Sequence, residues 1–113
     1  MKQYSLTCDL KNDPELIVKY RKYHEKIWPE ITQSIHDKRV IHMEIYLYKT
    51  RMFMIMEVND DFSFEEALAM DKANPRVQEW ENLMWKYQQS PPGAAKGEKW
   101  VLMEKIFDLK KNT

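Results

Sequence analysis

Four segments in which apolar and polar residues alternate constrain the fold of this 113-residue chain most strongly. A period of two places every second side chain on one face, which is typical of a β-strand with one buried face. The segments span residues 3–10, 39–48, 52–58 and 100–109. In the second segment, the pattern predicts one face of Ile41, Met43, Ile45 and Leu47 and another of His42, Glu44, Tyr46 and Tyr48. We therefore expect four strands, of which the second and third form a hairpin.

The first helix is predicted to begin at Pro14 and to be interrupted at Pro29. Asn12 or Asp13 can cap its amino end, and a proline at the first helical position loses no hydrogen bond. Pro29 has no amide donor and disfavours the α conformation at Trp28, so the helix should kink or restart there. A shorter helical piece is expected to follow.

Two later helices are also marked by their capping residues. Ser63 and Glu66 form a capping box, which predicts a helix through about Met70. Asn74-Pro75 opens another helix, predicted to run to about Gln88. Residues at helical spacing give that last helix an inward stripe of Val77, Trp80, Met84 and Tyr87.

The predicted order of elements is β α β β α β, which indicates an α+β fold. This order is the split pattern of a ferredoxin-like antiparallel sheet with helices on one face. Both glycines fall in the segment 90–99, the main irregular loop, and no repeat or linker divides residues 1–113, so we expect a single domain. The other sheet face carries apolar as well as polar side chains, so a second subunit is expected to cover it in a homodimer resembling a dimeric α/β barrel.

Composition excludes several classes of partner. The formal net charge is zero, with 18 basic and 18 acidic residues, so a nucleic-acid partner is not expected. No apolar stretch approaches the roughly 18 residues that span a bilayer, so we expect no membrane partner. Cys8 is the only cysteine and no apolar run of signal-peptide length precedes it, so the cytoplasm is the expected location.

No motif for a metal or cofactor is recognised in the chain. The His, Cys, Asp and Glu residues lack the spacings of metal sites, and the two glycines form no phosphate-binding loop. A serine-nucleophile motif is also missing. We therefore predict neither a metal nor a cofactor, and acid–base chemistry remains.

His24 is the first candidate for that chemistry. It lies four residues after Tyr20, so the two side chains share one face of the predicted helix. An imidazole titrates near pH 6.5 and can both give and take a proton at neutral pH. The alternative is a core histidine bonded to a backbone carbonyl. Glu44, in mid-strand, is either paired with a shifted pKa or simply exposed to solvent.

Four aromatic residues could stack on the apolar face of a sugar: Tyr20, Trp28, Trp80 and Trp85. Their helical spacing fits an ordinary hydrophobic core equally well.

The chain resembles the L-rhamnose mutarotases in several stretches along nearly its whole length. The matches are Tyr20 to His24 with the following Ile27-Trp28-Pro29-Glu30, then Ile45-Tyr46-Leu47, Trp80, and Glu104-Lys105-Ile106-Phe107. The resemblance implies a dimeric ferredoxin-like α+β protein that exchanges the α and β anomers of a monosaccharide. It implies that His24 is the proton donor and that Tyr20 and Trp80 contact the sugar.

Two departures from the family pattern bear on the substrate. Met43 stands where the family has a sugar-contacting tyrosine, and Glu81 stands where it has a second tryptophan. Trp85 could replace some of the lost stacking area. We therefore expect a 6-deoxy-L-hexose, L-rhamnose or L-fucose, with Tyr20, Trp28, Met43, Glu44, Trp80, Glu81 and Trp85 as binding residues.

Anomer exchange needs a proton delivered to the ring oxygen and one removed from the anomeric hydroxyl. Glu44 or a tyrosine hydroxyl could assist His24 in this reaction. Two other functions remain open: a cofactor-independent oxygenase of the dimeric α+β barrel type, and a sugar-binding or regulatory module without catalysis.

Overall fold

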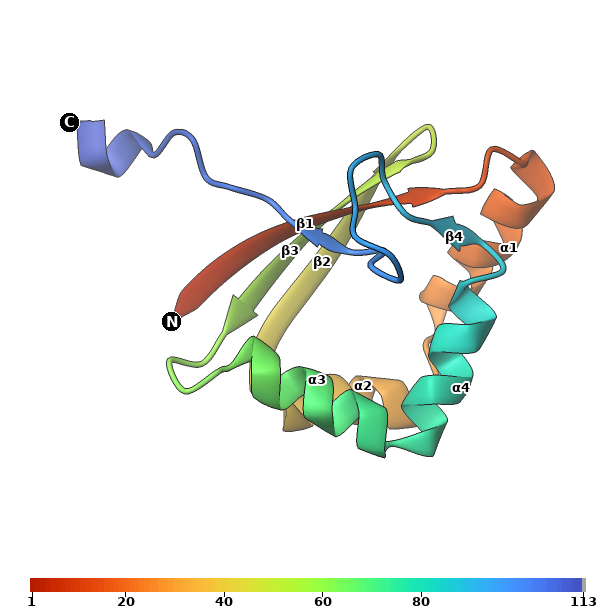
Figure 1. Cartoon of the computed structure of the whole chain (residues 1–113), viewed down its shortest axis with the longest axis horizontal. Helices are drawn as coiled ribbons and strands as arrows, with labels where there is room; N and C mark the ends of the chain where they lie inside the picture. The colour runs from red at the N-terminus through yellow and green to blue at the C-terminus, as the bar shows by residue number, and fades with distance from the viewer. Residues whose placement is uncertain (113) are drawn as a thin grey trace.

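An antiparallel sheet and four α-helices form the molecule in this computed structural model, which describes residues 1–112 (Figure 1). The strands are β1 (Lys2–Leu10), β2 (Val40–Tyr48), β3 (Arg51–Val58), β4 (Gln88–Gln89) and β5 (Val101–Leu102). The helices are α1 (Pro14–Glu25), α2 (Pro29–Asp37), α3 (Phe64–Ala73) and α4 (Pro75–Met84), followed at the carboxyl end by the 3-10 helix η1 (Leu109–Asn112). The predicted α+β class is confirmed.

β1 lies at the centre of the sheet. One edge pairs with β3 from Lys2↔Val58 to Asp9↔Arg51, and β3 in turn pairs with β2. The other edge pairs with β5 at Leu6 and with β4 at Leu10. The sheet order is therefore β2-β3-β1-β4, with β5 beside β4 along the same edge of β1. β4 and β5 together replace the single last strand of the predicted pattern.

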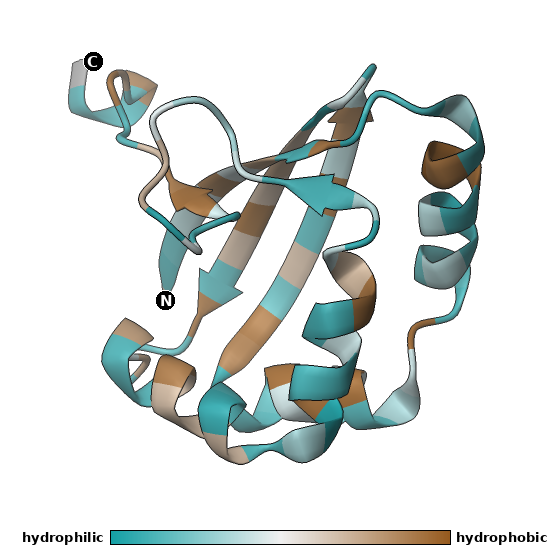
Figure 2. Ribbon diagram, turned by 45° about the vertical axis from the view of Figure 1, so that its right-hand side comes forward, coloured by the Kyte–Doolittle hydropathy of each residue, from teal (hydrophilic) through white to brown (hydrophobic). Residues whose placement is uncertain are grey.

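The helices lie on one side of the sheet (Figures 1 and 2). The strand residues buried on this face are Leu6, Cys8, Leu10, Val40, Met52, Met54, Met56 and Val58. On the opposite face Tyr46 and Tyr48 are exposed, as the alternation predicts. The described helices all fall short of the length and apolarity needed to cross a membrane.

A β-bulge changes the predicted orientation of one residue of β2. The register shifts between Val40 and His42, so Val40 is 5% exposed and Ile41 is 47% exposed. The prediction that Ile41 shares the inner face with Met43 is therefore wrong. An extra residue in one strand of a pair locally reverses which side chains face inward. The apolar and polar pattern of the sequence does not reveal such a bulge.

The helix boundaries follow the predicted caps. The Asp13 carboxylate accepts from the backbone N–H of Glu15 at 3.0 Å, and the Ser63 hydroxyl accepts from that of Glu66 at 3.3 Å. α1 ends at Glu25, and α2 restarts at Pro29 after an extended Trp28. The predicted interruption is confirmed.

The carboxyl-terminal third departs from the sequence prediction in two places. α4 ends at Met84 instead of near Gln88, because Gln88 pairs with Leu10 of β1 and extended backbone is needed there. The last strand covers only Val101–Leu102 instead of reaching residue 109. Beyond the bond from the Met103 N–H to the Ser5 carbonyl, the chain leaves the sheet, although its apolar alternation continues.

Asn74 offers a test of the junction that carries α4. Its side-chain oxygen accepts from the N–H groups of Arg76 at 3.0 Å and Val77 at 3.3 Å. We expect Asn74→Ala to lower the free energy of unfolding by about 1 kcal/mol, since the cap is lost. Asn74→Asp keeps the cap and should stay close to the wild type in urea unfolding. Equal stability of all three proteins would contradict this assignment.

Candidate active site

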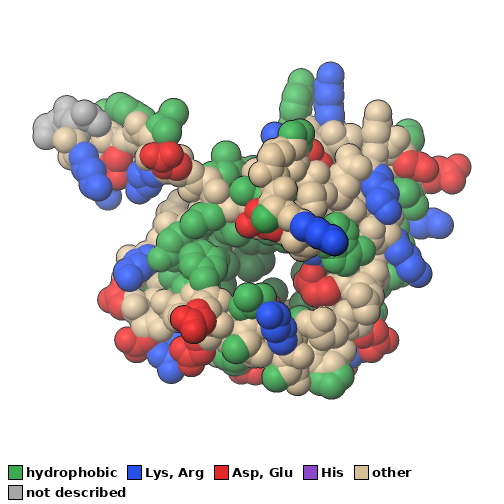
Figure 3. All heavy atoms as spheres, viewed as in Figure 1, with side chains coloured by type: hydrophobic (Ala, Val, Ile, Leu, Met, Phe, Trp, Pro, Cys, Tyr) green, Lys and Arg blue, Asp and Glu red, His purple; other side chains and the backbone are tan. Residues whose placement is uncertain are grey.

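A cavity of about 370 Å³ lies between the sheet and the helices. Figure 3 shows the molecule hollowed there, with hydrophobic side chains along the wall. The sheet contributes Leu6, Val40, Met43, Ile45, Met54 and Met56, and the helices contribute Tyr20, His24, Ile31, Ile35, Trp80 and Glu81 among others. This volume is in the range of small-molecule sites, roughly 300 to 1,000 Å³.

His24 has a defined tautomer at the cavity wall. Its Nδ1 lies 2.9 Å from the backbone carbonyl oxygen of Tyr20. A carbonyl can only accept a hydrogen bond, so Nδ1 carries the proton in the neutral ring and Nε2 keeps a free lone pair. The ring also lies 4.2 Å from the Tyr20 ring and 5.8 Å from that of Trp80, measured between centroids. His24 is thus held in one orientation and can accept a proton at Nε2.

Burial shifts the pKa values of His24 and Tyr20 in opposite directions. Burial lowers the pKa of His24 below its ordinary 6.5, while the hydrogen bond to the Tyr20 carbonyl opposes this change in part. Burial also raises the pKa of the Tyr20 hydroxyl above its ordinary value. At neutral pH the site therefore combines a neutral imidazole, able to act as a base, with a protonated phenol.

Trp80 connects the cavity with the break between α1 and α2. Its ring meets the Trp28 ring edge to face at 5.0 Å, and the Arg76 guanidinium lies 3.8 Å from the Trp28 centroid. Trp28 thus packs behind Trp80 and does not line the cavity itself. Trp28 therefore packs against the hydrophobic core, whereas Trp80 forms part of the cavity wall.

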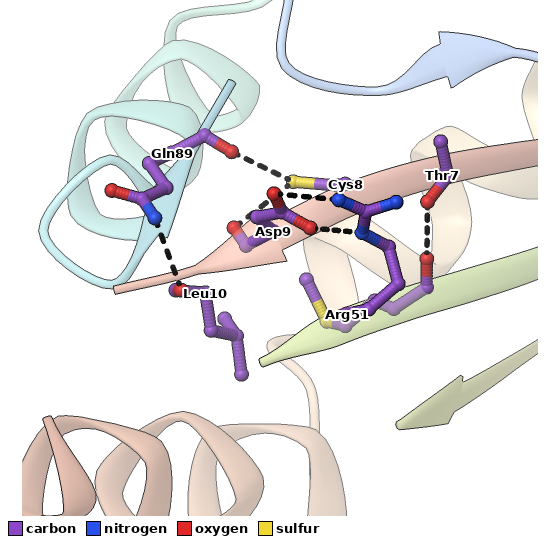
Figure 4. A network of polar contacts seen from close by, with 7 residues as sticks. Thr7, Cys8, Asp9, Leu10, Arg51 and Gln89 are labelled. Carbon is purple, nitrogen blue, oxygen red and sulfur yellow. Dashed lines mark hydrogen bonds and ion pairs between the residues drawn. The ribbon is translucent and has the colours of Figure 1, made fainter. Parts of the chain in front are cut away.

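Polar groups gather where α4 ends. Gln88 is buried, and its Nε2 donates to the Tyr20 hydroxyl at 3.0 Å. Gln89 and β1 hold this strand end in place, since Gln89 Nε2 donates to the Leu10 carbonyl at 3.5 Å (Figure 4). The Asp9–Arg51 ion pair joins the same end of β1 to β3 (Figure 4).

Glu81 also lines the cavity, and its Oε2 lies 2.6 Å from Lys99 Nζ.

The L-rhamnose mutarotase family model matches residues 3–109. The chain belongs to this family. It is a mutarotase and hence an isomerase. This result favours the mutarotase prediction over the oxygenase and the non-catalytic sugar-binding module.

Two curated relatives of this mutarotase carry different sugars in their names. An L-fucose mutarotase of Xanthomonas campestris is 36% identical over 111 residues, covering 96% of this chain and 89% of its own. An L-rhamnose mutarotase of Enterococcus faecalis is 26% identical over 98 residues, covering 85% of this chain and 89% of its own.

Two crystal structures share the fold. An L-rhamnose mutarotase of Formosa agariphila superposes with a TM-score of 0.71 at 19% identity, covering 96% of this chain and 98% of its own. A dimeric ferredoxin-like protein from an uncultured marine organism superposes with a TM-score of 0.51 at 12% identity, covering 94% and 90%. The ferredoxin-like arrangement predicted for this mutarotase is thereby supported at the level of the fold.

The structure brings together five of the eight residues singled out in the sequence. The residues that line the cavity are Tyr20, His24, Met43, Trp80 and Glu81. Trp85 lies at the carboxyl end of α4, partly exposed, with Lys99 Nζ 4.9 Å from its centroid. Glu44 points to the other face of the sheet, where it is paired with His42 Nε2 at 3.2 Å and accepts from the Tyr46 hydroxyl at 3.1 Å.

These contacts lower the pKa of Glu44, with the hydrogen bond from His42 as the main cause. Among the described residues, no group of three or more His, Cys, Asp and Glu side chains could hold a metal ion.

Two polar components of the cavity were not predicted from the sequence. Gln88 lies 68 positions after Tyr20, and only the pairing of β4 with β1 brings the two together. Lys38, which follows α2, and Asp71 of α3 form an ion pair of 2.8 Å at the cavity wall. Neither pair has a local spacing that would reveal it, because each contact crosses between elements.

His24 can be titrated directly by NMR. We expect its Cε1 proton to titrate with a pKa below 6.5 in the folded mutarotase and near 6.5 in urea, since unfolding removes the burial. The unfolded chain then binds more protons below pH 6.5, so the free energy of unfolding should fall as the pH drops through this window. The His24→Asn spectrum assigns the signal. A folded-state pKa at or above 6.5 would contradict the description of the site.

Proposed function

We propose that this mutarotase interconverts the α and β anomers of a 6-deoxy-L-hexose, L-fucose or L-rhamnose, with His24 as the acid–base residue. The observation that carries this proposal is the free Nε2 of a neutral imidazole at the wall of a largely apolar cavity. A sugar whose C6 is a methyl group suits such a wall, because it buries apolar surface there without leaving a hydroxyl unbonded.

The reaction begins when His24 Nε2 takes the proton of the anomeric hydroxyl. The O1 electron pair then forms the carbonyl, the bond between C1 and the ring oxygen breaks, and the ring oxygen takes the proton now held at Nε2 to become the C5 hydroxyl. Rotation of C1 exposes its other face to that hydroxyl. On closure the neutral imidazole takes the proton of the C5 hydroxyl and gives it to O1, so the same residue acts as base and then as proton donor in each half-reaction.

Tyr20 is better placed than Glu44 to assist His24 in the reaction. Its hydroxyl accepts from Gln88 and keeps its own proton, so it can donate a hydrogen bond to the ring oxygen. Glu44 faces away from the cavity, across the sheet. We therefore assign Tyr20 to the ring oxygen and Trp80 to the apolar face of the sugar, with Met43 as apolar wall.

L-fucose is the first candidate of the two sugars. The relative named for L-fucose is 36% identical to this chain and the one named for L-rhamnose is 26% identical. The replacement of a family tryptophan by Glu81 also gives the cavity a hydrogen-bond acceptor in place of a flat ring.

Anomer exchange followed by saturation-difference NMR tests this function. We expect faster exchange for L-fucose or L-rhamnose than without protein, and none for D-glucose. His24→Asn should lower the catalysed rate at least about 100-fold, since acid–base catalysis contributes that much. His36→Asn, an exposed residue of α2, is the matched control. The wild-type rate should decline as the pH falls through the pKa of His24, and a folded, fully active His24→Asn protein would refute the assignment.

We further propose that the open sheet face forms a homodimer. This face carries Tyr46 and Phe53, whose ring centroids lie 6.3 Å apart, beside charged groups such as Glu44. An apolar surface of this kind on one side of a sheet favours burial against a copy of itself.

Sedimentation velocity should find a dimer at micromolar concentration. Phe53→Glu places charge in the contact and should give a monomer, whereas Lys19→Glu, on the outer surface of α1, should not. A wild-type monomer under these conditions would exclude the dimer.

A further inference from the structure

The end of the cavity beside α4 holds polar groups that the reaction itself does not use. Gln88 is only 3% exposed, and its Oε1 has no hydrogen-bond partner among the described residues. Glu81 lines the same cavity one turn before the end of α4. Two acceptor groups therefore line a cavity whose other walls are mainly apolar.

A buried acceptor without a partner is costly. Most buried polar side-chain atoms in proteins have at least one hydrogen bond, and the loss of a partner costs the desolvation of the group. The Gln88 amide is anchored at the Tyr20 hydroxyl, to which its Nε2 donates at 3.0 Å. Its Oε1 is therefore held ready for a donor from within the cavity, and a sugar hydroxyl is such a donor.

Lys99 holds the second acceptor in place. Its side chain is only 8% exposed, and Nζ forms an ion pair with Glu81 Oε2 at 2.6 Å, although the angles are not those of a hydrogen bond. The Trp85 ring packs against the same ammonium at 4.9 Å. This contact ties one carboxylate oxygen of Glu81 to the loop after β4 and leaves the other oxygen, Oε1, for a ligand.

We propose that Glu81 and Gln88 bind hydroxyl groups of the sugar that take no part in ring opening, and that Lys99 positions Glu81. This subsite rests on the proposed mutarotase function and extends it to substrate selection. Two acceptors require hydroxyl donors, so a sugar lacking those hydroxyls binds weakly.

Glu81 variants test the subsite through the Michaelis constant of anomer exchange. Glu81→Met should raise KM about 10- to 100-fold, the range expected for lost hydrogen bonds to a charged group, with kcat within about threefold of the wild type. Glu81→Gln keeps an acceptor and should have a smaller effect. Glu79→Gln, on the exposed side of the same helix, should leave both constants unchanged. Wild-type KM in Glu81→Met would overturn the subsite.

Gln88→Met tests the second acceptor. The change is nearly isosteric, and circular dichroism and thermal unfolding verify the fold. We expect a higher KM again, and an unchanged KM in the folded protein would remove Gln88 from the subsite.

The positioning role of Lys99 has its own readout. Lys99→Met should raise KM less than Glu81→Met does, and Lys99→Arg, which keeps the cation, should restore most of the affinity. In the double variant Glu81→Met/Lys99→Met, KM should be no higher than in Glu81→Met alone, because the two residues act through one contact. Additive effects, or a loss of thermal stability with unchanged KM, would reduce Lys99 to a structural residue.

Direct binding separates this proposal from the function on which it rests. Quenching of tryptophan fluorescence by L-fucose and L-rhamnose in the His24→Asn background measures the dissociation constant without turnover. We expect Glu81→Met to raise that constant by the same factor as KM. Weakened binding together with an inactive wild type would sustain the subsite and refute the proposed anomer exchange of L-fucose and L-rhamnose. Unchanged binding with an active wild type would do the reverse.

Discussion

The pairing of β1 with three other strands is the interaction on which the rest of the structure depends. One edge of β1 pairs with β3, which in turn pairs with β2. The other edge of β1 pairs with the two short strands β4 and β5. This arrangement fixes where the loop between β4 and β5 leaves and re-enters the sheet. It thereby brings Gln88 to Tyr20 and Lys99 to Glu81, so the polar end of the cavity depends on the register of one strand.

The same sheet explains why a cavity exists beside a well-packed core. Cys8, Leu10 and Met52 belong to the same buried hydrophobic cluster as Val77, Trp80 and Met84 of α4. Toward the other end of the sheet, α3 buries none of its residues, and the space between it and the strands stays open. An unfilled interior forfeits dispersion contacts and hydrophobic burial. We infer that a bound sugar supplies part of this missing packing.

The local elements were largely predictable from the sequence, whereas the contacts between them were not. Asp13, Ser63 and Asn74 cap helices as their spacing predicts, because a cap involves only residues two or three positions apart. The bulge before His42 and the short β5 were missed, since both depend on the partner strand. His24 and Tyr20 were predicted on one helix face, but the bond that selects the tautomer of His24 was only one of two alternatives.

The sequence by itself determined the order of strands and helices as far as α4, the interruption at Pro29, the place of His24 and Tyr20 on one face of α1, and membership of the mutarotase family. Only the tertiary structure decided that Glu44 faces away from the cavity and that Gln88 and Lys99 belong beside Glu81. The physical reason is the distance along the chain between the residues that interact. Periodicity and capping are set by near neighbours in the chain, whereas a cavity wall is assembled from residues whose distance in sequence is bridged by strand register and core packing.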